Sequence, residues 1–420
     1  MAVRAQVPAA AASQSACRLS SAPGWKKQDL PTFRSMTSST DLQFMQDALA
    51  LARLAAPACR PNPAVGCVLV GADGQLLGRG MTQRPGQAHA EVMALRDARS
   101  RGASVAGATA YVTLEPCAHQ GRTPPCCDAL TEAGIARVVV AVRDPNPRVA
   151  GQGLARLRAA GVDVTLGVGA TDSRELNLGF FSRMLRGLPW LRVKAAASLD
   201  GRTALPNGVS QWITSLQARA DGHAWRARAD AILTGMGTIL GDDPRLDVRG
   251  VDLPRQPVLV IADSALRTPL DARLWRVRDR QVLIYTASAS PEPAAALRAR
   301  GAEVVCLPRA DPAQADGRQV DLRSLLRDLA ARGVGELHVE AGGILGGALW
   351  RAGLVDELLL YQAPLLLGEG AGIAQLAPLT TVAQGVALDY VDVARIGPDL
   401  RLRARLRGSS RWLHADGAAR

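Results

Sequence analysis

Four polar residues in the first third of the sequence have the types and spacing of a catalytic metal site: His89, Glu91, Cys117 and Cys126. One imidazole and two thiolates can occupy three corners of a tetrahedral zinc site and leave the fourth for water, which is typical of catalytic zinc. Glu91 can lie beside such a metal without binding it. Its carboxylate could take a proton from zinc-bound water and hand it to a departing amine.

This order of residues is similar to the signature of zinc deaminases, H-x-E followed by P-C and a second Cys. In that signature two residues separate the cysteines, whereas eight separate Cys117 from Cys126 here. The alternative is a histidine on a helix face and two buried thiols with no metal. The joint pattern, which includes Pro116, favours the metal site.

The predicted secondary structure places these residues at the ends of elements. A helix over 88–101 holds His89 and Glu91 in its first turn, and a strand over 108–114 ends just before Cys117. Cys126 follows two prolines, which suit the first turn of a helix. Helix starts also favour thiolate over thiol. Cys127 points about 100° away on the same helix, so we expect it in the core.

The rest of this region alternates between strands and helices. We expect helices over 41–56 and 153–160, strands over 64–70, 75–81, 137–142 and 162–168, and a helical connector over 171–186. Such alternation predicts a largely parallel sheet covered on both faces, with catalytic groups at the strand ends.

A second α/β region begins near residue 191. Its predicted strands are 231–233, 258–261, 282–285, 304–307, 337–339 and 358–360, with a helix over 322–331, closing strands within 386–406 and a frayed tail over 408–420. Glycine-rich segments at 235–238 and 340–347 follow strands, where backbone N–H groups could hold a pyrophosphate. Neither segment has the dinucleotide-binding pattern G-x-G-x-x-G. Spacing alone therefore does not decide between a dinucleotide site and ordinary glycine-rich strand ends.

Composition is that of an ordinary globular protein, with 420 residues, 48% hydrophobic and 21% charged. The net charge of +12 comes mostly from arginines scattered along the sequence. No segment combines basic with aromatic residues in the way that nucleic-acid binding needs, so we expect no nucleic-acid partner. Seven cysteines without regular spacing indicate a reducing compartment, and no apolar run of about 18 residues predicts a membrane span. We therefore expect a cytoplasmic protein, and a homo-oligomer.

Residues 1–40 read as a disordered extension or an over-long gene start, with a transit peptide as the alternative.

Motifs in both halves resemble the bifunctional deaminase/reductases of riboflavin biosynthesis, over about residues 41 to 407. The matching segments are Asn62-Pro63-x-Val65-Gly66, His89-Ala90-Glu91-Val92, Thr113-Leu114-Glu115-Pro116-Cys117-x-His119-x-Gly121-Arg122-Thr123-Pro124-Pro125-Cys126-Cys127, Asp144-Pro145-Asn146-Pro147, Lys194-x-Ala196-x-Ser198-Leu199-Asp200-Gly201-Arg202-Thr203-Ala204, Ser210-Gln211-Trp212-Ile213-Thr214, Asp242-Asp243-Pro244 and Glu340-Ala341-Gly342.

The resemblance implies a cytidine-deaminase-like three-layer α/β domain over 41–187 and a dihydrofolate-reductase-like α/β domain over 188–420. It implies zinc on His89, Cys117 and Cys126, with Glu91 as proton shuttle, and NADPH in the second domain. The implied cofactor residues are Ala196, Trp212, Thr238, Asp242, Gly342, Gly343, Ile344, Leu345, Gly346, Gly347 and Ala348. The implied substrate residues are Ser210, Arg226, Leu246, Arg249 and Glu340, of which the two arginines suit a ribose 5-phosphate.

The implied reactions are hydrolytic deamination of 2,5-diamino-6-(5-phosphoribosylamino)pyrimidin-4(3H)-one and NADPH-dependent reduction of the ribosyl group, giving 5-amino-6-(5-phosphoribitylamino)uracil. Lys194 and Asp200 are polar groups expected near the second site without an assigned role. Thr82 stands where many relatives have His, so a substrate contact could differ. The alternatives are a polynucleotide deaminase, which would want a basic aromatic channel, and a non-catalytic zinc or NADPH-binding protein, which would not need Glu91.

Overall fold

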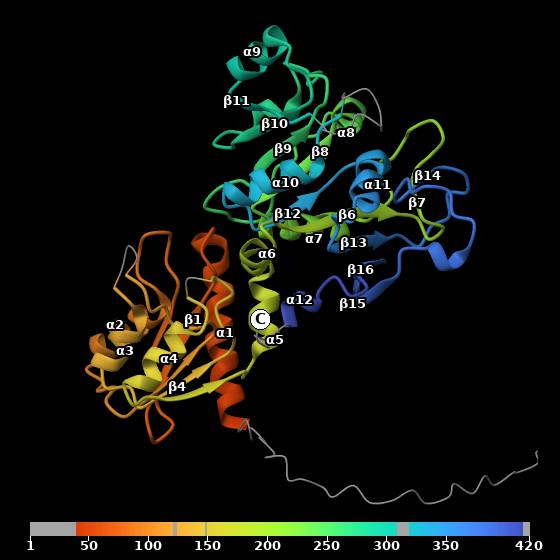
Figure 1. Cartoon of the computed structure of the whole chain (residues 1–420). Helices are drawn as coiled ribbons and strands as arrows, with labels where there is room; N and C mark the ends of the chain where they lie inside the picture. The colour runs from red at the N-terminus through yellow and green to blue at the C-terminus, as the bar shows by residue number, and fades with distance from the viewer. Residues whose placement is uncertain (1–38, 121–123, 148, 309–318, 415–420) are drawn as a thin grey trace, which may run out of the picture. The chain divides into compact units, whose positions relative to one another are not determined.

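The first of two β-sheets has five strands in the order β2-β1-β3-β4-β5. In the computed structural model, which describes residues 39–120, 124–147, 149–308 and 319–414, the sheet lies in the red-to-yellow part of the chain (Figure 1). Its strands are β1 (Gly66–Val70), β2 (Leu76–Met81), β3 (Thr109–Val112), β4 (Arg137–Val140) and β5 (Asp163–Leu166). β1 is antiparallel to both β2 and β3, and β3, β4 and β5 are parallel. The predicted parallel sheet is therefore correct for three of the five strands.

Helices cover both faces of this sheet. On one face α1 (Ser39–Cys59) packs Met45, Ala48 and Leu49 against alternate residues of β1, β3 and β4. On the other lie α2 (Ala90–Ser100), α3 (Cys126–Glu132) and α4 (Gln152–Ala159). This confirms the predicted three-layer α/β/α domain.

The connector between the two sheets is helical, as predicted, and consists of two helices, α5 (Ala170–Leu176) and α6 (Leu178–Arg186). The break is at Asn177, whose side chain binds the backbone of a distant segment. Its Oδ1 accepts the N–H of Ala64 at 2.8 Å, and its Nδ2 donates to the carbonyl of Ala64 at 3.0 Å. A tertiary contact of this kind leaves no periodic signal in the sequence.

The second sheet has nine strands in the order β11-β10-β9-β8-β12-β6-β13-β16-β15. They are β6 (Trp190–Ala197), β8 (Ala231–Gly235), β9 (Val258–Ala262), β10 (Val282–Thr286), β11 (Ala302–Cys306), β12 (Glu336–Val339), β13 (Glu357–Gln362), β15 (Leu388–Ile396) and β16 (Asp399–Leu406). Neighbours from β11 to β13 are parallel, whereas β16 is antiparallel to both of its neighbours, β13 and β15. A short pair, β7 (Arg202–Ala204) and β14 (Ala371–Gly372), lies beside the sheet.

Helices also cover both faces of the second sheet. One face packs against α7 (Leu216–Arg228), α8 (Met236–Asp242) and α9 (Pro291–Ala299). The other packs against α10 (Leu322–Ala331) and α11 (Gly343–Arg351). Two 3₁₀ turns, η1 (Arg273–Arg276) and η2 (Val382–Gln384), lie in the connections. The second sheet thus has its own apolar core.

A charged layer lies in this sheet beneath α7. Arg192, which is 1% exposed, donates to Glu336 at 3.1 Å and to Glu357 at 2.6 Å. The Arg192 guanidinium also lies 4.6 Å from the ring centroid of Trp225 on α7. Because each buried charge has an opposite partner, the layer is tolerated inside the fold.

The end of the described chain is not frayed, which corrects the prediction of a frayed tail for residues 408–414. Residues of α12 (Arg411–His414) pack against the start of β6. Leu413 is buried, and the Trp412 ring lies 6.1 Å from that of Trp190 and 4.6 Å from the Arg186 guanidinium. Residues 415–420, and 1–38 of the predicted extension, lie outside the described residues. None of the described helices has the length and apolar content that a membrane crossing requires.

Candidate functional site

The three predicted metal ligands meet in space. The Nδ1 atom of His89 lies 3.3 Å from Sγ of Cys126 and 3.6 Å from Sγ of Cys117, and all three atoms lie within 4.8 Å of one another. With Zn–N near 2.0–2.1 Å and Zn–S near 2.3 Å, tetrahedral geometry places ligand atoms about 3.5–3.8 Å apart. The three side chains therefore fit one zinc ion and leave a fourth position.

Secondary structure brings the ligands together as the spacing predicted. His89 is the N-cap of α2, and Cys126 is the first residue of α3 after Pro125. The N–H of Cys126 donates to Sγ of Cys117 at 3.4 Å. The S–H of Cys126 lowers the pKa of Cys117 against the effect of burial, and His89 lowers it further, so both neighbours favour the thiolate form of Cys117.

Glu91 lies in the first turn of α2 and is 3% exposed. It does not belong to the set of mutually close ligand atoms found among the described residues. Burial, and then the Cys117 thiolate, raise the pKa of Glu91 to about 7. A carboxyl group with a pKa near the working pH is suited to accept a proton and return it.

Glu115 is a buried acid for which sequence reasoning had no role. Its carboxylate accepts the backbone N–H groups of Gly153 at 2.9 Å and Leu154 at 3.2 Å in the first turn of α4. It also accepts those of Gly151 at 2.9 Å and Asp144 at 3.1 Å. The strand end that carries Cys117 is thereby tied to the start of α4. The only sequence signal was its place inside the matched motif.

Close packing against Gly153 and Cys127 also holds the strand end that carries Cys117. A Cβ atom at Gly153 would overlap the carbonyl oxygen of Pro116, so only glycine allows this approach. Cys127 is fully buried and its Sγ donates to the carbonyls of Pro116 at 3.3 Å and Gly153 at 3.5 Å. The prediction that Cys127 is a core residue is confirmed. Thr82 is also internal, and its hydroxyl accepts the N–H of Val65 at 3.1 Å.

In the second half, the structure brings together three of the predicted substrate residues. Arg226 on α7 forms a two-pronged ion pair with Glu340, in which Nη2 lies 2.7 Å from Oε2, and its Nη1 donates to the carbonyl of Asp247 at 2.8 Å. Burial would raise the pKa of Glu340, but Arg226 lowers it well below its ordinary value. Arg249 follows two residues after Asp247 and has a 55% exposed side chain. Leu246 differs from these, because its side chain is buried in the core and its φ of 51° is left-handed.

The two glycine-rich segments also meet. The N–H of Gly342, the N-cap of α11, donates to Oγ1 of Thr238 on α8 at 3.2 Å. The residues from Gly343 to Leu345 form the first turn of α11, whose N–H groups have no partners within the helix. Ile344 is 71% exposed at this end. The arrangement can hold a phosphate group of a dinucleotide.

The later glycines of the segment have a different environment. A Cβ at Gly347 would overlap the carbonyl of Gln375, so the chain near Gln375 lies directly on this part of α11. At Gly342 a Cβ would meet no atom within 4 Å. Open space therefore lies beside Gly342, at the start of the predicted cofactor segment, whereas Gly347 is needed for close packing against the chain near Gln375.

The remaining predicted residues lie in β6, in α8, in α11 and in the segment between β7 and α7. Ala196 is in β6. Ser210 and Asp242 approach one another at 3.5 Å between Oγ and Oδ1. Trp212 is 69% exposed, with the Arg219 guanidinium 4.3 Å from its ring centroid. Gly346 and Ala348 are in α11.

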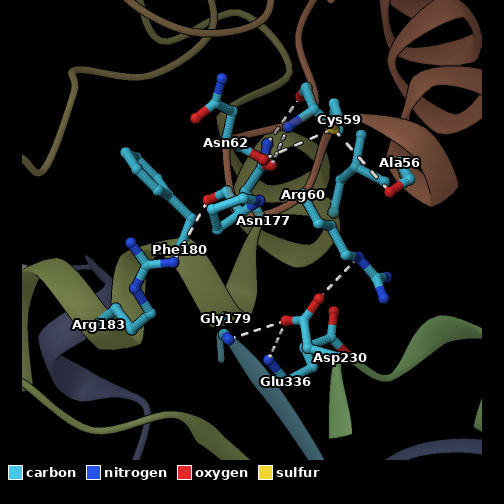
Figure 2. A pocket seen from close by; sticks show the side chains of 14 residues that line it. Ala56, Cys59, Arg60, Asn62, Asn177, Gly179, Phe180, Arg183, Asp230 and Glu336 are labelled. Carbon is cyan, nitrogen blue, oxygen red and sulfur yellow. Dashed lines mark hydrogen bonds and ion pairs between the residues drawn. The ribbon is translucent and has the colours of Figure 1, made fainter. Parts of the chain in front are cut away.

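A cavity of about 40 Å³ lies away from both sites, between the end of α1, the connector helices and the second sheet (Figure 2). Arg60 and Asp230 approach one another across it, with 3.5 Å between Nε and Oδ1. This oxygen is buried and accepts no hydrogen bond from a described group. The volume and the polar lining suit ordered water.

Comparison with known proteins covers both halves of the chain. The family model for the cytidine and deoxycytidylate deaminase zinc-binding region matches residues 38–142, and that for the RibD C-terminal domain matches 189–402. The riboflavin biosynthesis protein RibD of Escherichia coli K12 is 44% identical over 375 residues, which are 86% of this chain and 98% of that protein. The RibD protein of Haemophilus influenzae is 41% identical over 378 residues, 87% of this chain and 97% of that protein.

Two solved structures match with a TM-score of 0.77 over 87% of this chain and 99% of the other. One is RibD of Acinetobacter baumannii, which is 40% identical. The other is a diaminohydroxyphosphoribosylaminopyrimidine deaminase/5-amino-6-(5-phosphoribosylamino)uracil reductase of Thermotoga maritima, which is 30% identical.

Proposed function

The chain belongs to the RibD family of bifunctional deaminase/reductases of riboflavin biosynthesis, and on that premise we propose which residues of each half carry out its step. The deaminase half acts on 2,5-diamino-6-(5-phosphoribosylamino)pyrimidin-4(3H)-one. The reductase half converts the ribosyl group of its product to ribityl. The observation that carries the first assignment is the His89, Cys117 and Cys126 triangle with Glu91 beside it.

In the deaminase half, His89, Cys117 and Cys126 hold zinc. When bound, zinc lowers the pKa of a water molecule to about 7 and so makes a nucleophile available. Glu91 accepts a proton from the attacking water and delivers it to the departing amine, which leaves as ammonia. Glu115 and Gly153 keep Cys117 in place through the start of α4.

In the reductase half, the start of α11 and Thr238 hold the phosphates of NADPH, and Ala196, Trp212 and Asp242 line the remainder of its site. NADPH, when bound, supplies a hydride for the ribosyl carbon. Arg226, Arg249, Ser210 and Glu340 bind the substrate with their side chains, and Leu246, whose side chain is buried, contributes through its backbone. The bidentate fork of an arginine matches the oxygens of the ribose 5-phosphate.

Mass spectrometry of products formed with and without NADPH tests the two steps together. Without NADPH the diaminopyrimidinone should lose the amine and gain oxygen and stop there. With NADPH the product should gain two further hydrogens. Ribityl product without deamination, or no reaction in either case, would contradict the proposal.

We place the division between the halves after residue 187, with each sheet supplying one site. The protein is proposed to work in the cytoplasm, which agrees with the absence of any disulfide among the six described cysteines.

A homo-oligomer is supported by the apolar edge of the second sheet. β15 is the edge strand, and Tyr390, Val393 and Leu400 share one face of β15 and β16 with exposed fractions of 73%, 55% and 39%. The same strand of a second copy could pair with it. Light scattering should give at least twice the chain mass, and Val393→Asp should lower it. A monomer at working concentration would contradict this proposal.

A further inference from the structure

His223 lies on α7 three residues before Arg226, so both side chains lie on one side of the helix. It was not among the residues implied by the family resemblance. The backbone N–H of Arg249 donates to Nδ1 of His223 at 3.2 Å. The Nη2 atom of Arg249 lies 3.3 Å from Nε2 of the same ring. The imidazole of His223 thus lies against both the backbone N–H and the guanidinium of Arg249, a residue already proposed to bind substrate.

The two contacts cannot both be hydrogen bonds. A neutral imidazole has one N–H donor and one acceptor nitrogen, while the backbone N–H and the guanidinium of Arg249 are both donors. The backbone N–H is fixed by the fold, so Nδ1 accepts and the ring proton sits on Nε2. Burial, Arg226 and Arg249 lower the pKa of His223, which keeps the ring neutral at pH 7.

The consequence is a pair of donors that lack an acceptor. The Nε2–H of His223 and the Nη2 of Arg249 face one another at 3.3 Å, and an oxygen anion that accepts from both would relieve the mismatch. Arg226 is committed to Glu340 and to the carbonyl of Asp247, so much of its charge is already neutralised. A phosphate at this place needs donors beyond the two arginines.

We propose that Nε2–H of His223 is a third donor to the 5-phosphate of the substrate and helps to select phosphorylated over unphosphorylated sugar. This rests on the proposed function of the reductase half. The neutral ring adds a hydrogen bond without adding charge beside Arg226 and Arg249, which already repel one another.

The test compares reduction of the deaminated substrate with reduction of the same compound after removal of its phosphate. The readout is the ratio of the two kcat/KM values in the wild type, His223→Phe and His223→Gln. Phe keeps the ring and removes the donor, so the ratio should fall at least about tenfold, as expected for a lost hydrogen bond to a charged group. Gln can place an amide N–H near the position of Nε2 and should restore most of the ratio.

Ala224→Gln controls for a change at the neighbouring exposed position of α7 and should leave the ratio unchanged. If His223→Phe lowers kcat/KM equally for both compounds, or changes neither, the proposal is overturned while the proposed function stands. If the wild type itself does not distinguish the two compounds, the phosphate site of the proposed function fails as well. Deamination, measured on the same preparations, should not differ among the variants.

Discussion

The carboxylate of Glu115 holds the N–H of Gly153 at 2.9 Å, although 38 positions separate the two residues in sequence. Through this bond and three others, the buried Glu115 carboxylate joins the strand end that carries Cys117 to Asp144, to Gly151 and to the first turn of α4. The placement of Cys117 therefore depends on a helix, α4, that carries none of the proposed zinc ligands.

Glu115→Gln should weaken zinc binding with the domain still folded. The amide nitrogen would face backbone donors that the carboxylate now satisfies, so the loop before α4 should shift. Zinc affinity, measured by competition with a chelator, should fall about tenfold or more, as for other supports of ligating residues. Glu132→Gln, an exposed acid on α3, is the matched control. Unchanged zinc affinity in Glu115→Gln would remove the positioning role.

Glu91→Gln should separate metal binding from proton transfer. The amide keeps the size of the side chain but cannot accept the proton, so deamination should drop by about 10²–10⁴-fold while zinc stays near one per chain. Metal analysis and both activity assays on one preparation check this. Loss of zinc from Glu91→Gln would indicate that Glu91 is a zinc ligand. Near-normal deamination by this variant would contradict its role as proton shuttle.

Cys126→Ser and Cys127→Ser form a matched pair of neighbouring thiols. The first removes a zinc ligand and should lower zinc content and the stability of the deaminase half. The second replaces a core thiol that donates to two carbonyls, a role that a hydroxyl can take over, so zinc should remain. Equal zinc loss in both variants would contradict the assignment of Cys126 alone.

Gly342→Ala and Gly347→Ala should have opposite effects in the reductase half. A methyl group at Gly342 meets no protein atom, so the melting temperature should hold while NADPH binding weakens. At Gly347 the methyl group overlaps the carbonyl of Gln375, which should cost about 1–3 kcal/mol of unfolding free energy. Fluorescence titration with NADPH and thermal unfolding distinguish the two. Normal NADPH affinity in Gly342→Ala would move the cofactor away from this helix start.

The charged layer around Arg192 predicts acid sensitivity. Burial would raise the pKa of Glu336, but Arg228 and Arg192 outweigh burial and lower it from 4.5 to about 2. The folded state then binds fewer protons than the unfolded state between these values. The stabilisation is complete above about pH 4.5 and is lost as the pH falls towards 2, by up to about 3 kcal/mol.

Unfolding free energy measured across this range should therefore fall more steeply in the wild type than in Glu336→Gln. That variant should also lose about 3 kcal/mol at neutral pH, because it leaves two arginines short of a partner. Glu292→Gln, at an exposed position of α9, is the control and should follow the wild type. Parallel pH profiles for the wild type and Glu336→Gln would contradict this account.

The connector predicts where the chain can be divided. Arg186 on α6 donates to both oxygens of buried Asp356, at 2.6 and 2.8 Å, and Glu175 on α5 pairs with Arg405 at 2.6 and 2.7 Å. A fragment of residues 188–420 loses both partners, whereas 170–420 keeps them. Both should reduce pre-deaminated substrate, but the shorter should unfold at least about 3 kcal/mol more easily. Equal stability would show that the connector does not support the second sheet.

Local sequence patterns predicted the helices, strands and element ends that depend on residues close together in the sequence. Helix 322–331 has the predicted bounds because its leucines repeat at helical spacing, and the His89, Cys117 and Cys126 triangle follows from three element ends. The break at Asn177, the role of Glu115 and the packing of Trp412 depend on partners far away in sequence. No periodicity or spacing records such contacts.

The packing of α12 has a consequence for the order in which the protein can be completed during synthesis. Trp190 begins the second half of the chain, yet Trp412 and Leu413, which cover it, are made after every described strand of the second sheet. Until they emerge from the ribosome, the nascent chain carries an uncovered tryptophan at the start of β6. A stop codon after residue 410 would spare all the proposed catalytic and binding residues and still yield a protein prone to aggregate.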